Sequence, residues 1–562
     1  MVPARRVVHP DRTEWGKRPI KSSTGRIALV VLVSLALGLG AYVGVGRLIE
    51  EDVPGFREQA CSLPREWLEL TRRGHFEARS GQISLLPRTP AYMQQGRSGW
   101  SHSGPWPYLQ DVPLVFYGPG VLDEGVEVDR PVDLADVAPT MATLLKGGLA
   151  ADGASLDEVA MVDEEFVTRP NLKLIVTIVW DGGGWNTLRQ WPDDWPNLKA
   201  MMEGGVTYTA ATAGSSPSVT PAVHTTIGTG FYPATHGVTG VPVRDEEGEV
   251  VDAFLDGESS RFIQVPALAE RWDVQNGNEA LVGMVGYEPW HLGMIGKGAE
   301  SQGGDKDHAA WLNVETNEWK TNADHYELPR SLRETGGLEE DLDELDAADG
   351  ARDRAWGPHA ILDDPSRIEE TPAFIRYHTR AMLNLLEQEG YGDDDITDLL
   401  FTNYKQIDRV GHYFNMASDE VRQSLVETDD QLGVILDHLD RDVGRGRYAV
   451  VLTADHGQQP DAGPIDGYPI DPNEVKADIA GRFGPIVRAV WPTEVFLLPD
   501  EMDERGVTVE DVARFLSGYR LRDNVKGPAA LYKSAGSFGP SSRLFDLAIP
   551  AAILPGMSCG PG

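Results

Sequence analysis

The chain has 562 residues, which exceeds one average domain, and its 41% hydrophobic content is that of a globular protein. Its 87 acidic residues outnumber the 50 basic residues and give a formal net charge of −37. Such a surface repels nucleic acid and gains nothing from anionic lipid, so we expect no nucleic-acid polymer as a partner. The charge identifies no substrate and leaves the oligomeric state open.

The first distinct feature is the uncharged stretch 27–46 (IALVVLVSLALGLGAYVGVG), which has the length of a membrane-spanning helix. Residues 1–26 before it are rich in Arg and Lys, whereas Glu50, Glu51 and Asp52 follow it. This asymmetry predicts a single-pass anchor in the cell membrane, with a cytoplasmic basic tail and the remainder outside the cytoplasm. A cleaved signal peptide is the alternative, and it would export the remainder of the chain as well.

The exported portion begins with residues 47–78, which we interpret as a linker. Both cysteines of the chain, Cys61 and Cys559, lie in this exported portion. A disulfide is permitted outside the cytoplasm, and two cysteines allow one pairing. The sequence leaves a disulfide and two unpaired thiols equally open.

Five apolar, β-branched runs predict buried strands at Val112–Tyr117, Leu174–Trp180, Ala280–Val285, Leu399–Tyr404 and Tyr448–Thr453. Helical patterns lie between them, at 374–389 and after Ser418, which is a suitable N-cap. Strands that alternate with helices predict an α/β fold, a mostly parallel sheet sandwiched by helices. The turn-rich region near 241–360 suggests an inserted cap over this sheet.

Acidic and imidazole side chains follow three of these strands. Asp181 comes directly after the strand that ends at Trp180, and Asp455 and His456 follow the strand that ends at Thr453. Asp408 and His412 follow the strand that ends at Tyr404, and their four-residue spacing places both on one face of a helix. Because parallel strands end at one edge of a sheet, we expect these residues to converge into a metal site.

A candidate nucleophile lies in the segment Ser215–His224. Thr220 precedes Pro221, and proline is typical of a first helical turn. A hydroxyl at a helix N-terminus lies in a positive field that favours an alkoxide and a bound anion. The alternative is that Thr220 only caps the helix.

This set of residues, with TPAVH at 220–224, TGFYPATHG at 229–237 and DHG at 455–457, resembles the alkaline phosphatase superfamily. It is most similar to the type I phosphodiesterase/nucleotide pyrophosphatase branch. The resemblance implies an alkaline phosphatase-like fold and a phosphoric ester hydrolase with a threonine nucleophile, Thr220, and two zinc ions. It assigns Asp181, Thr220, Asp455 and His456 to one metal, and Asp408 and His412 to the other. Manganese is the alternative metal for such ligands.

The family supplies a further histidine ligand downstream of Asp-His-Gly, but no histidine follows His456 here. Upstream, the segment from Ser101 to Gly118 resembles the family's carboxyl-terminal segment and contains His102. This predicts a circular permutation, with residues 79–150 as the family's last segment and 151–562 as the remainder of the catalytic domain. His102 would then complete the second metal site, and Cys61 and Cys559 would lie near the two ends of the rearranged segment.

The nucleophile segment departs from the family at Val223, where the phosphodiesterase branch commonly has an asparagine that contacts a phosphoryl oxygen. The candidates to replace this amide are Lys405, Asn403, His291 and Lys297. Sulfatases share the fold, but the motif that they require is absent. Two alternative functions remain open: a membrane-anchored phospho-alcohol transferase of the same fold, and a non-catalytic envelope protein.

Overall fold

The computed structural model describes residues 53–94, 101–146, 150–159, 172–525 and 538–559. None of the helices in these ranges is both long and apolar enough to cross a membrane. The predicted span at 27–46 and the basic tail at 1–26 lie outside the described residues.

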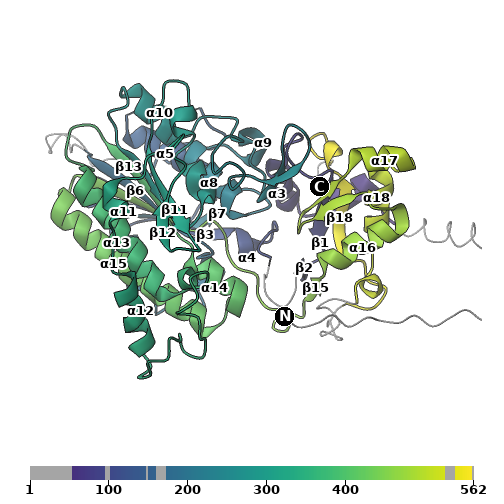
Figure 1. Ribbon diagram of the computed structural model, residues 1–562. Coiled ribbons are helices and arrows are strands. Elements are labelled where there is room, and N and C mark those ends of the chain that lie inside the picture. The colour runs from purple at the N-terminus through teal and green to yellow at the C-terminus, as the bar shows by residue number, and fades with distance from the viewer. Residues whose placement is uncertain (1–52, 95–100, 147–149, 160–171, 526–537, 560–562) are drawn as a thin grey trace, which may run out of the picture. The chain divides into compact units, whose positions relative to one another are not determined.

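A ten-stranded sheet forms the centre of the described chain (Figure 1). Its strand order is β12-β11-β10-β13-β6-β14-β3-β7-β4, and β5 also pairs with β7. The strands are β3 (Asp111–Tyr117), β4 (Val126–Val128), β5 (Val132–Asp133), β6 (Leu174–Trp180), β7 (Val206–Thr212), β10 (Val282–Val285), β11 (His308–Asn313), β12 (Glu318–Lys320), β13 (Asp398–Tyr404) and β14 (Tyr448–Thr453). Within this sheet only β3 and β12 run antiparallel to the others. The predicted α/β architecture with a mostly parallel sheet is therefore confirmed.

Both faces of this sheet are buried, because alternate residues of β6 enter two different hydrophobic cores. Ile175 and Val179 pack into the core formed with α5 (Val137–Leu144), α8 (Thr220–Thr229) and α10 (Leu268–Gln275). Val176 and Ile178 pack into the opposite core, whose helices are α7 (Pro196–Gly204), α11 (Arg330–Arg333), α12 (Leu338–Ala347), α13 (Pro372–Glu389), α14 (Gln406–Phe414) and α15 (Asp419–His438). The sheet is thus a middle layer between two helical layers.

The periodicity of the sequence located the main elements well. The strands β6 and β14 have the predicted bounds, and the helices α13 and α15 occupy the two predicted helical segments. Ser418 caps α15, because its hydroxyl accepts a hydrogen bond from the backbone N–H of Val421.

The region 241–360 differs from the expected cap. It supplies β10, β11 and β12 to the large sheet itself, and only its hairpin of β8 (Pro242–Arg244) and β9 (Val250–Asp252) forms a separate small sheet. The long turns around these short strands obscured the strand pattern in the sequence.

A second sheet lies apart from the large one and contains four antiparallel strands in the order β16-β17-β1-β18. Its strands are β1 (Ile83–Pro87), β16 (Val487–Val490), β17 (Glu494–Leu497) and β18 (Phe545–Pro550), and α16 (Pro472–Phe483), α17 (Pro499–Arg505) and α18 (Val509–Ser517) accompany them (Figure 1). A parallel pair of β2 (Ala91–Met93) and β15 (Tyr468–Ile470) lies beside it. The sequence pattern did not predict this second sheet.

The amino-terminal part of the described chain is joined to the carboxyl-terminal part. The predicted linker contains two short helices, α2 (Phe56–Ser62) and α3 (Arg65–Arg73), so most of its described part is not an extended linker. Cys61 on α2 forms a disulfide with Cys559, 498 residues further along the chain. This resolves the alternatives that the sequence left open for the two cysteines.

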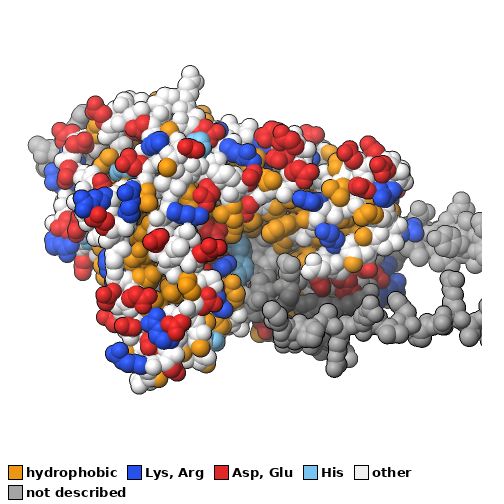
Figure 2. Space-filling model, in the orientation of Figure 1, with side chains coloured by type: hydrophobic (Ala, Val, Ile, Leu, Met, Phe, Trp, Pro, Cys, Tyr) orange, Lys and Arg blue, Asp and Glu red, His pale blue; other side chains and the backbone are white. Residues whose placement is uncertain are grey.

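Acidic side chains are spread over the visible face of the molecule, with Lys and Arg interspersed among them (Figure 2). The excess of acids is therefore a general property of this face and is not concentrated in one patch. This agrees with an interpretation in terms of solubility.

Candidate functional site

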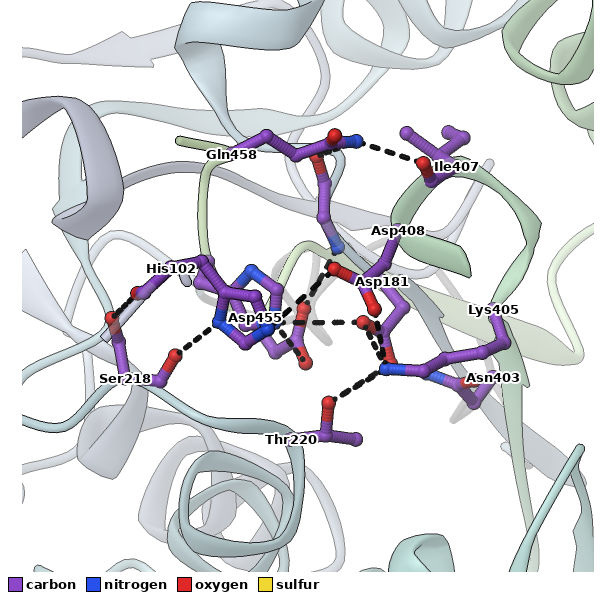
Figure 3. A network of polar contacts seen from close by, with 12 residues as sticks. His102, Asp181, Ser218, Thr220, Asn403, Lys405, Ile407, Asp408, Asp455 and Gln458 are labelled. Carbon is purple, nitrogen blue, oxygen red and sulfur yellow. Dashed lines mark hydrogen bonds and ion pairs between the residues drawn. The ribbon is translucent and has the colours of Figure 1, made fainter. Parts of the chain in front are cut away.

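Three neighbouring parallel strands, β13, β6 and β14, end at one edge of the large sheet and carry the predicted residues. Asp181 follows β6, Lys405 follows β13, and Asp455 and His456 follow β14. Asp181, Asp455 and His456 are fully buried. The side chains that follow these three strands lie close together, as we expected from their positions at the strand ends (Figure 3).

The turn after Asp181 needs glycine at position 182. Gly182 has a φ of +70°, and a Cβ atom there would lie 2.9 Å from the Cα atom of Asp408. Its backbone N–H donates to Oδ1 of Asp455 over 3.1 Å. The glycine therefore lets two of the strand ends approach each other closely.

Asp408 and His412 lie one turn apart on α14, as their spacing predicted. The Nε2 atom of His412 is 3.4 Å from Oδ2 of Asp408. Asp408 is buried, whereas the His412 side chain is partly exposed.

His102 enters the site from the segment that precedes α4 (Pro107–Gln110) and β3. Because β3 runs antiparallel to β14, its first residues lie at the edge where β14 ends. The Nε2 atom of His102 is 3.6 Å from Oδ1 of Asp408, and its ring stacks on that of His456 with 3.6 Å between centroids. Its Nδ1 atom lies 3.2 Å from the carbonyl oxygen of Ser218, which orients the ring.

Thr220 is the first residue of α8, and Val219 occupies the N-cap position. The Thr220 hydroxyl does not cap the helix. Its oxygen lies 2.9 Å from Nζ of Lys405, which donates to it, and 3.4 Å from Oδ2 of Asp181 (Figure 3). The threonine is therefore held at the centre of the acidic and imidazole groups.

The site contains more negative than positive charge. Lys405 donates to Oδ1 of Asp181 over 2.9 Å and lies 2.8 Å from Oδ2 of Asp408. Burial and the nearby Asp455 raise the pKa of Asp181 well above its ordinary value. Burial alone would also raise the pKa of Asp408, but His412, Lys405 and His102 outweigh it and hold that pKa well below its ordinary value. One buried ammonium thus faces three buried carboxylates.

These donors fit metal ions. The acid and imidazole groups form overlapping clusters of three, namely His102 with Asp408 and His456, Asp181 with Asp455 and His456, and Asp181 with His224 and His291. Oδ2 of Asp455 and Nε2 of His456 are buried without a hydrogen-bond partner among the described residues, and they lie 3.4 Å apart. That separation is about the distance between two ligand atoms of a tetrahedral zinc ion with bonds of about 2.1 Å. Burial also lowers the pKa of His102, which favours the neutral imidazole that a metal requires.

The four predicted replacements for the missing amide lie in three different places. Asn403 and Lys405 both contact Asp181, and the amide of Asn403 donates to Oδ2 over 3.1 Å. His291 lies one layer further in, with its Nδ1 atom 3.1 Å from Nδ1 of His224. Lys297 is elsewhere, because it lines a separate cavity with Glu270 and Gln302. The structure therefore does not bring Lys297 into the site.

Two further residues of the site were not predicted from the sequence. His224 lies on α8 with its Nε2 atom 3.5 Å from Oδ2 of Asp455. It stands in the quoted motif TPAVH, so the resemblance could have singled it out. Gln458 donates to the carbonyl of Ile407 over 2.8 Å and thereby links the segment after β14 to α14 (Figure 3). No sequence pattern marks that glutamine.

A cavity of about 440 Å³ opens in front of these residues. One wall carries Thr220, Lys405 and His412, and the opposite wall comes from α16, β16 and the turn after β16. That opposite wall presents Lys476, Arg488, Trp491 and neighbouring residues. The space accommodates a substrate much larger than inorganic phosphate.

Comparison with known proteins agrees with this arrangement. The family model for type I phosphodiesterase / nucleotide pyrophosphatase matches residues 175–483. The chain belongs to this family. Members of the type I phosphodiesterase family are phosphoric ester hydrolases, so the chain is an enzyme of that class.

Two curated relatives of this family member are alkaline phosphatases. It is 24% identical over 420 residues to alkaline phosphatase PafA of Elizabethkingia meningoseptica, covering 65% of this chain and 75% of the relative. It is 23% identical over 353 residues to alkaline phosphatase PhoD of Zymomonas mobilis subsp. mobilis, covering 55% of this chain and 59% of the relative. The crystal structure of wild-type PafA superposes with a TM-score of 0.52 at 21% identity, covering 64% of this chain and 78% of that one. That similarity supports the alkaline phosphatase-like fold.

Proposed function

We propose that this chain hydrolyses phosphate esters in two steps, through transfer of the phosphoryl group to Thr220 and then to water. The observation that carries the proposal is the position of the Thr220 hydroxyl. It is the first side chain of α8, it leaves the helix uncapped, and it lies between Lys405 and Asp181 on the wall of the cavity. A hydroxyl in that position meets the phosphorus of an ester bound in the cavity.

Two zinc ions are the proposed cofactors, with manganese as the alternative. Asp181, Thr220, Asp455 and His456 would hold one ion, and His102, Asp408 and His412 would hold the other. Bound there, the ions would favour ionisation of the threonine hydroxyl and neutralise the charge of the phosphoryl oxygens. The surplus of buried carboxylates and the unpartnered atoms of Asp455 and His456 support this assignment.

Lys405 is the proposed substitute for the amide that Val223 lacks. Its ammonium already donates to the Thr220 oxygen. From that position it can stabilise both the ionised nucleophile and an oxygen of the transferred phosphoryl group. Asn403 positions Asp181, and His291 orients His224, so we propose supporting roles for these two.

The nucleophile is tested by trapping the intermediate. Thr220→Ser should retain part of the turnover and form a phosphoserine, whereas Thr220→Ala should lose turnover by a factor of at least 10³. Acid quenching of wild type with excess substrate, followed by peptide mass spectrometry, should locate phosphate on Thr220. Full turnover by Thr220→Ala with unchanged metal content would refute the proposal.

The physiological substrate is a phosphate ester with a sizeable organic group. The family is described as type I phosphodiesterase / nucleotide pyrophosphatase, and the relatives PafA and PhoD are named alkaline phosphatases. The cavity extends from Thr220 to Trp491 and Arg488, which gives room for an ester group beyond the phosphorus. Turnover of an aryl phosphomonoester and of the matching methyl aryl diester by one preparation decides between the two classes. An alcohol acceptor added to the same assay reveals any transfer reaction.

We also propose that the chain is a circular permutation of the family fold. The segment 79–150 lies before the family match, yet it contributes β3 beside β14 and the ligand candidate His102. Its β1 lies between β17 and the carboxyl-terminal strand β18. The Cα atoms of Cys61 and Cys559 are 5.4 Å apart, so the two ends of the described domain can be joined. A variant that starts at residue 172 and continues from 559 into 54–159 should fold and bind the same metals; loss of folding would contradict the proposal.

We propose that this domain works outside the cytoplasm and is held at the cell membrane by the segment 27–46. The basic residues before that segment and the disulfide of the domain support this location. Protease added to intact cells should remove the domain, and the membrane fraction should keep the amino terminus. Recovery of an intact chain from the cytosol would contradict it.

A further inference from the structure

A cluster of three aspartates lies away from the site described above. Asp273 is in the last turn of α10, and Asp305 and Asp307 lie in the loop before β11. Each offers a carboxylate oxygen, and the three oxygens lie within 4.8 Å of one another. Because β11 runs parallel to the strands whose ends carry the catalytic residues, a residue just before β11 lies at the opposite edge of the sheet.

Two of these carboxylates are buried. Asp273 is 3% exposed and Asp307 is 7% exposed, whereas Asp305 is open to solvent. Oδ1 of Asp273 is fully shielded and has no hydrogen-bond partner among the residues that the structure describes. Burying a carboxylate without a donor or counter-charge is costly, so such a group needs a cation or a proton.

No positive group in the described part of the chain fills this need. Among the residues that the structure describes, no Lys or Arg forms an ion pair with Asp273, Asp305 or Asp307, and no backbone N–H or side chain outside the cluster donates to their carboxylates. Lys306 lies between Asp305 and Asp307 in the sequence, but its ammonium donates to the carbonyl of Ala323 over 2.5 Å.

The neighbouring charges make the deficit larger. Burial and the proximity of Asp305 raise the pKa of Asp273 to about 7. Burial together with Asp273, Asp305 and Glu270 raises the pKa of Asp307 well above its ordinary value. Four carboxylates thus act on one another here, and no Lys or Arg of the described ranges forms an ion pair with the three aspartates.

We propose that Asp273, Asp305 and Asp307 bind a calcium ion at the edge of the large sheet opposite to Thr220. The donors are carboxylate oxygens alone, which suits hard cations and disfavours zinc. His308, which follows, does not belong to this group of clustered ligand atoms, and its Nδ1 atom lies 3.0 Å from the hydroxyl of Tyr391. Calcium accepts six to eight oxygens in flexible geometry, so three carboxylates suit it, whereas magnesium is usually held by one or two carboxylates and retains several waters.

Such an ion has a structural role. It joins the end of α10 to the loop that leads into β11, and both elements flank β10 in the large sheet. Binding to the folded chain stabilises it by mass action. This inference is independent of the proposed ester hydrolysis, because none of its residues belongs to that site.

The test uses the whole chain and calcium alone as the probe. After removal of bound metals and reloading with zinc, equilibrium dialysis against ⁴⁵Ca²⁺ should show one calcium ion per chain. Asp305→Asn, at an exposed position outside the hydrolytic site, should weaken calcium binding at least tenfold and leave ester turnover unchanged. The exposed Asp193→Asn serves as the matched control and should bind calcium like wild type.

Thermal unfolding supplies a second readout, because calcium should reverse the order of the unfolding temperatures of wild type and Asp305→Asn. In EDTA, Asp305→Asn should unfold at a higher temperature than wild type, because it removes one of the mutually repelling carboxylates. In millimolar calcium, the order should reverse. Absence of calcium binding by wild type, or equal binding by Asp305→Asn, would overturn the proposal, and a tighter affinity for magnesium would overturn the assignment to calcium.

Discussion

The ammonium nitrogen of Lys405 lies 2.9 Å from the hydroxyl oxygen of Thr220. Both side chains are buried, and the lysine also contacts Asp181 and Asp408. An ammonium that donates to a hydroxyl stabilises the ionised oxygen more than the neutral one. Lys405 is thus fixed where it can assist the proposed nucleophile, although it belongs to neither predicted set of metal ligands.

We expect Lys405→Met to lower kcat by a factor of about 10²–10³, as removal of a donor from a preorganised site commonly does. Methionine keeps a long side chain, so the fold should survive. Lys297→Met is the matched control, since Lys297 lines a separate cavity, and it should keep wild-type kcat. Steady-state turnover of an aryl phosphate ester checks both variants, and equal rates for the two would remove Lys405 from the proposed chemistry.

His102→Ala should lower the bound zinc from two ions to one per chain. His102 faces Asp408 over 3.6 Å and lies beside His412, so its loss removes one of three proposed ligands. Elemental analysis of the purified protein measures this directly. His325→Ala, which removes a histidine outside the site, should leave the metal content unchanged. Two zinc ions in both variants would show that His102 is not a ligand.

Part of this site could be predicted because it depends on local pattern. Asp181, Asp408 and Asp455 each follow an apolar run, and parallel strands align their ends at one edge of the sheet. The spacing of Asp408 and His412 also sufficed to place both on one turn of α14. Strand ends and helical periodicity are properties of short segments, so a single sequence reveals them.

Other parts depend on contacts between distant segments, which no local pattern encodes. The carbonyl of Ser218 orients His102 across 116 residues, and the sequence gives no sign of that pairing. In the four-stranded sheet β1 pairs with β18, and these two strands lie near opposite ends of the chain. The wall of the cavity that carries Arg488 and Trp491 is likewise set by this long-range pairing.

The disulfide between Cys61 and Cys559 should contribute about 2–4 kcal/mol to the free energy of unfolding. A link across 498 residues restricts the unfolded chain strongly, because loop-closure entropy grows with loop length. The double variant Cys61→Ser with Cys559→Ser should therefore unfold at a lower urea concentration than the oxidised wild type. Reduced wild type should match the variant. Equal midpoints for oxidised and reduced wild type would contradict a stabilising role.

Glu369 should make the stability of the fold depend on pH. Its side chain is 1% exposed, and burial raises its pKa to about 7. The hydroxyl of Tyr287 donates to Oε1 over 3.2 Å, and Arg409 lies 3.9 Å away, but these contacts do not offset burial. Because the pKa is higher in the folded than in the unfolded chain, the folded chain binds this proton more tightly. The resulting stabilisation is present below about pH 4.5 and is lost as the pH rises through 7.

The neutral variant Glu369→Gln should lack this dependence. Relative to the variant, wild type should lose about 2.5 kcal/mol of unfolding free energy between pH 5 and pH 8, because one pKa unit corresponds to about 1.4 kcal/mol. Urea unfolding of both proteins across this range measures the difference at each pH. Glu315→Gln, at an exposed turn, should follow the wild-type curve. Parallel curves for wild type and Glu369→Gln would show that Glu369 is ionised in the folded chain at no cost.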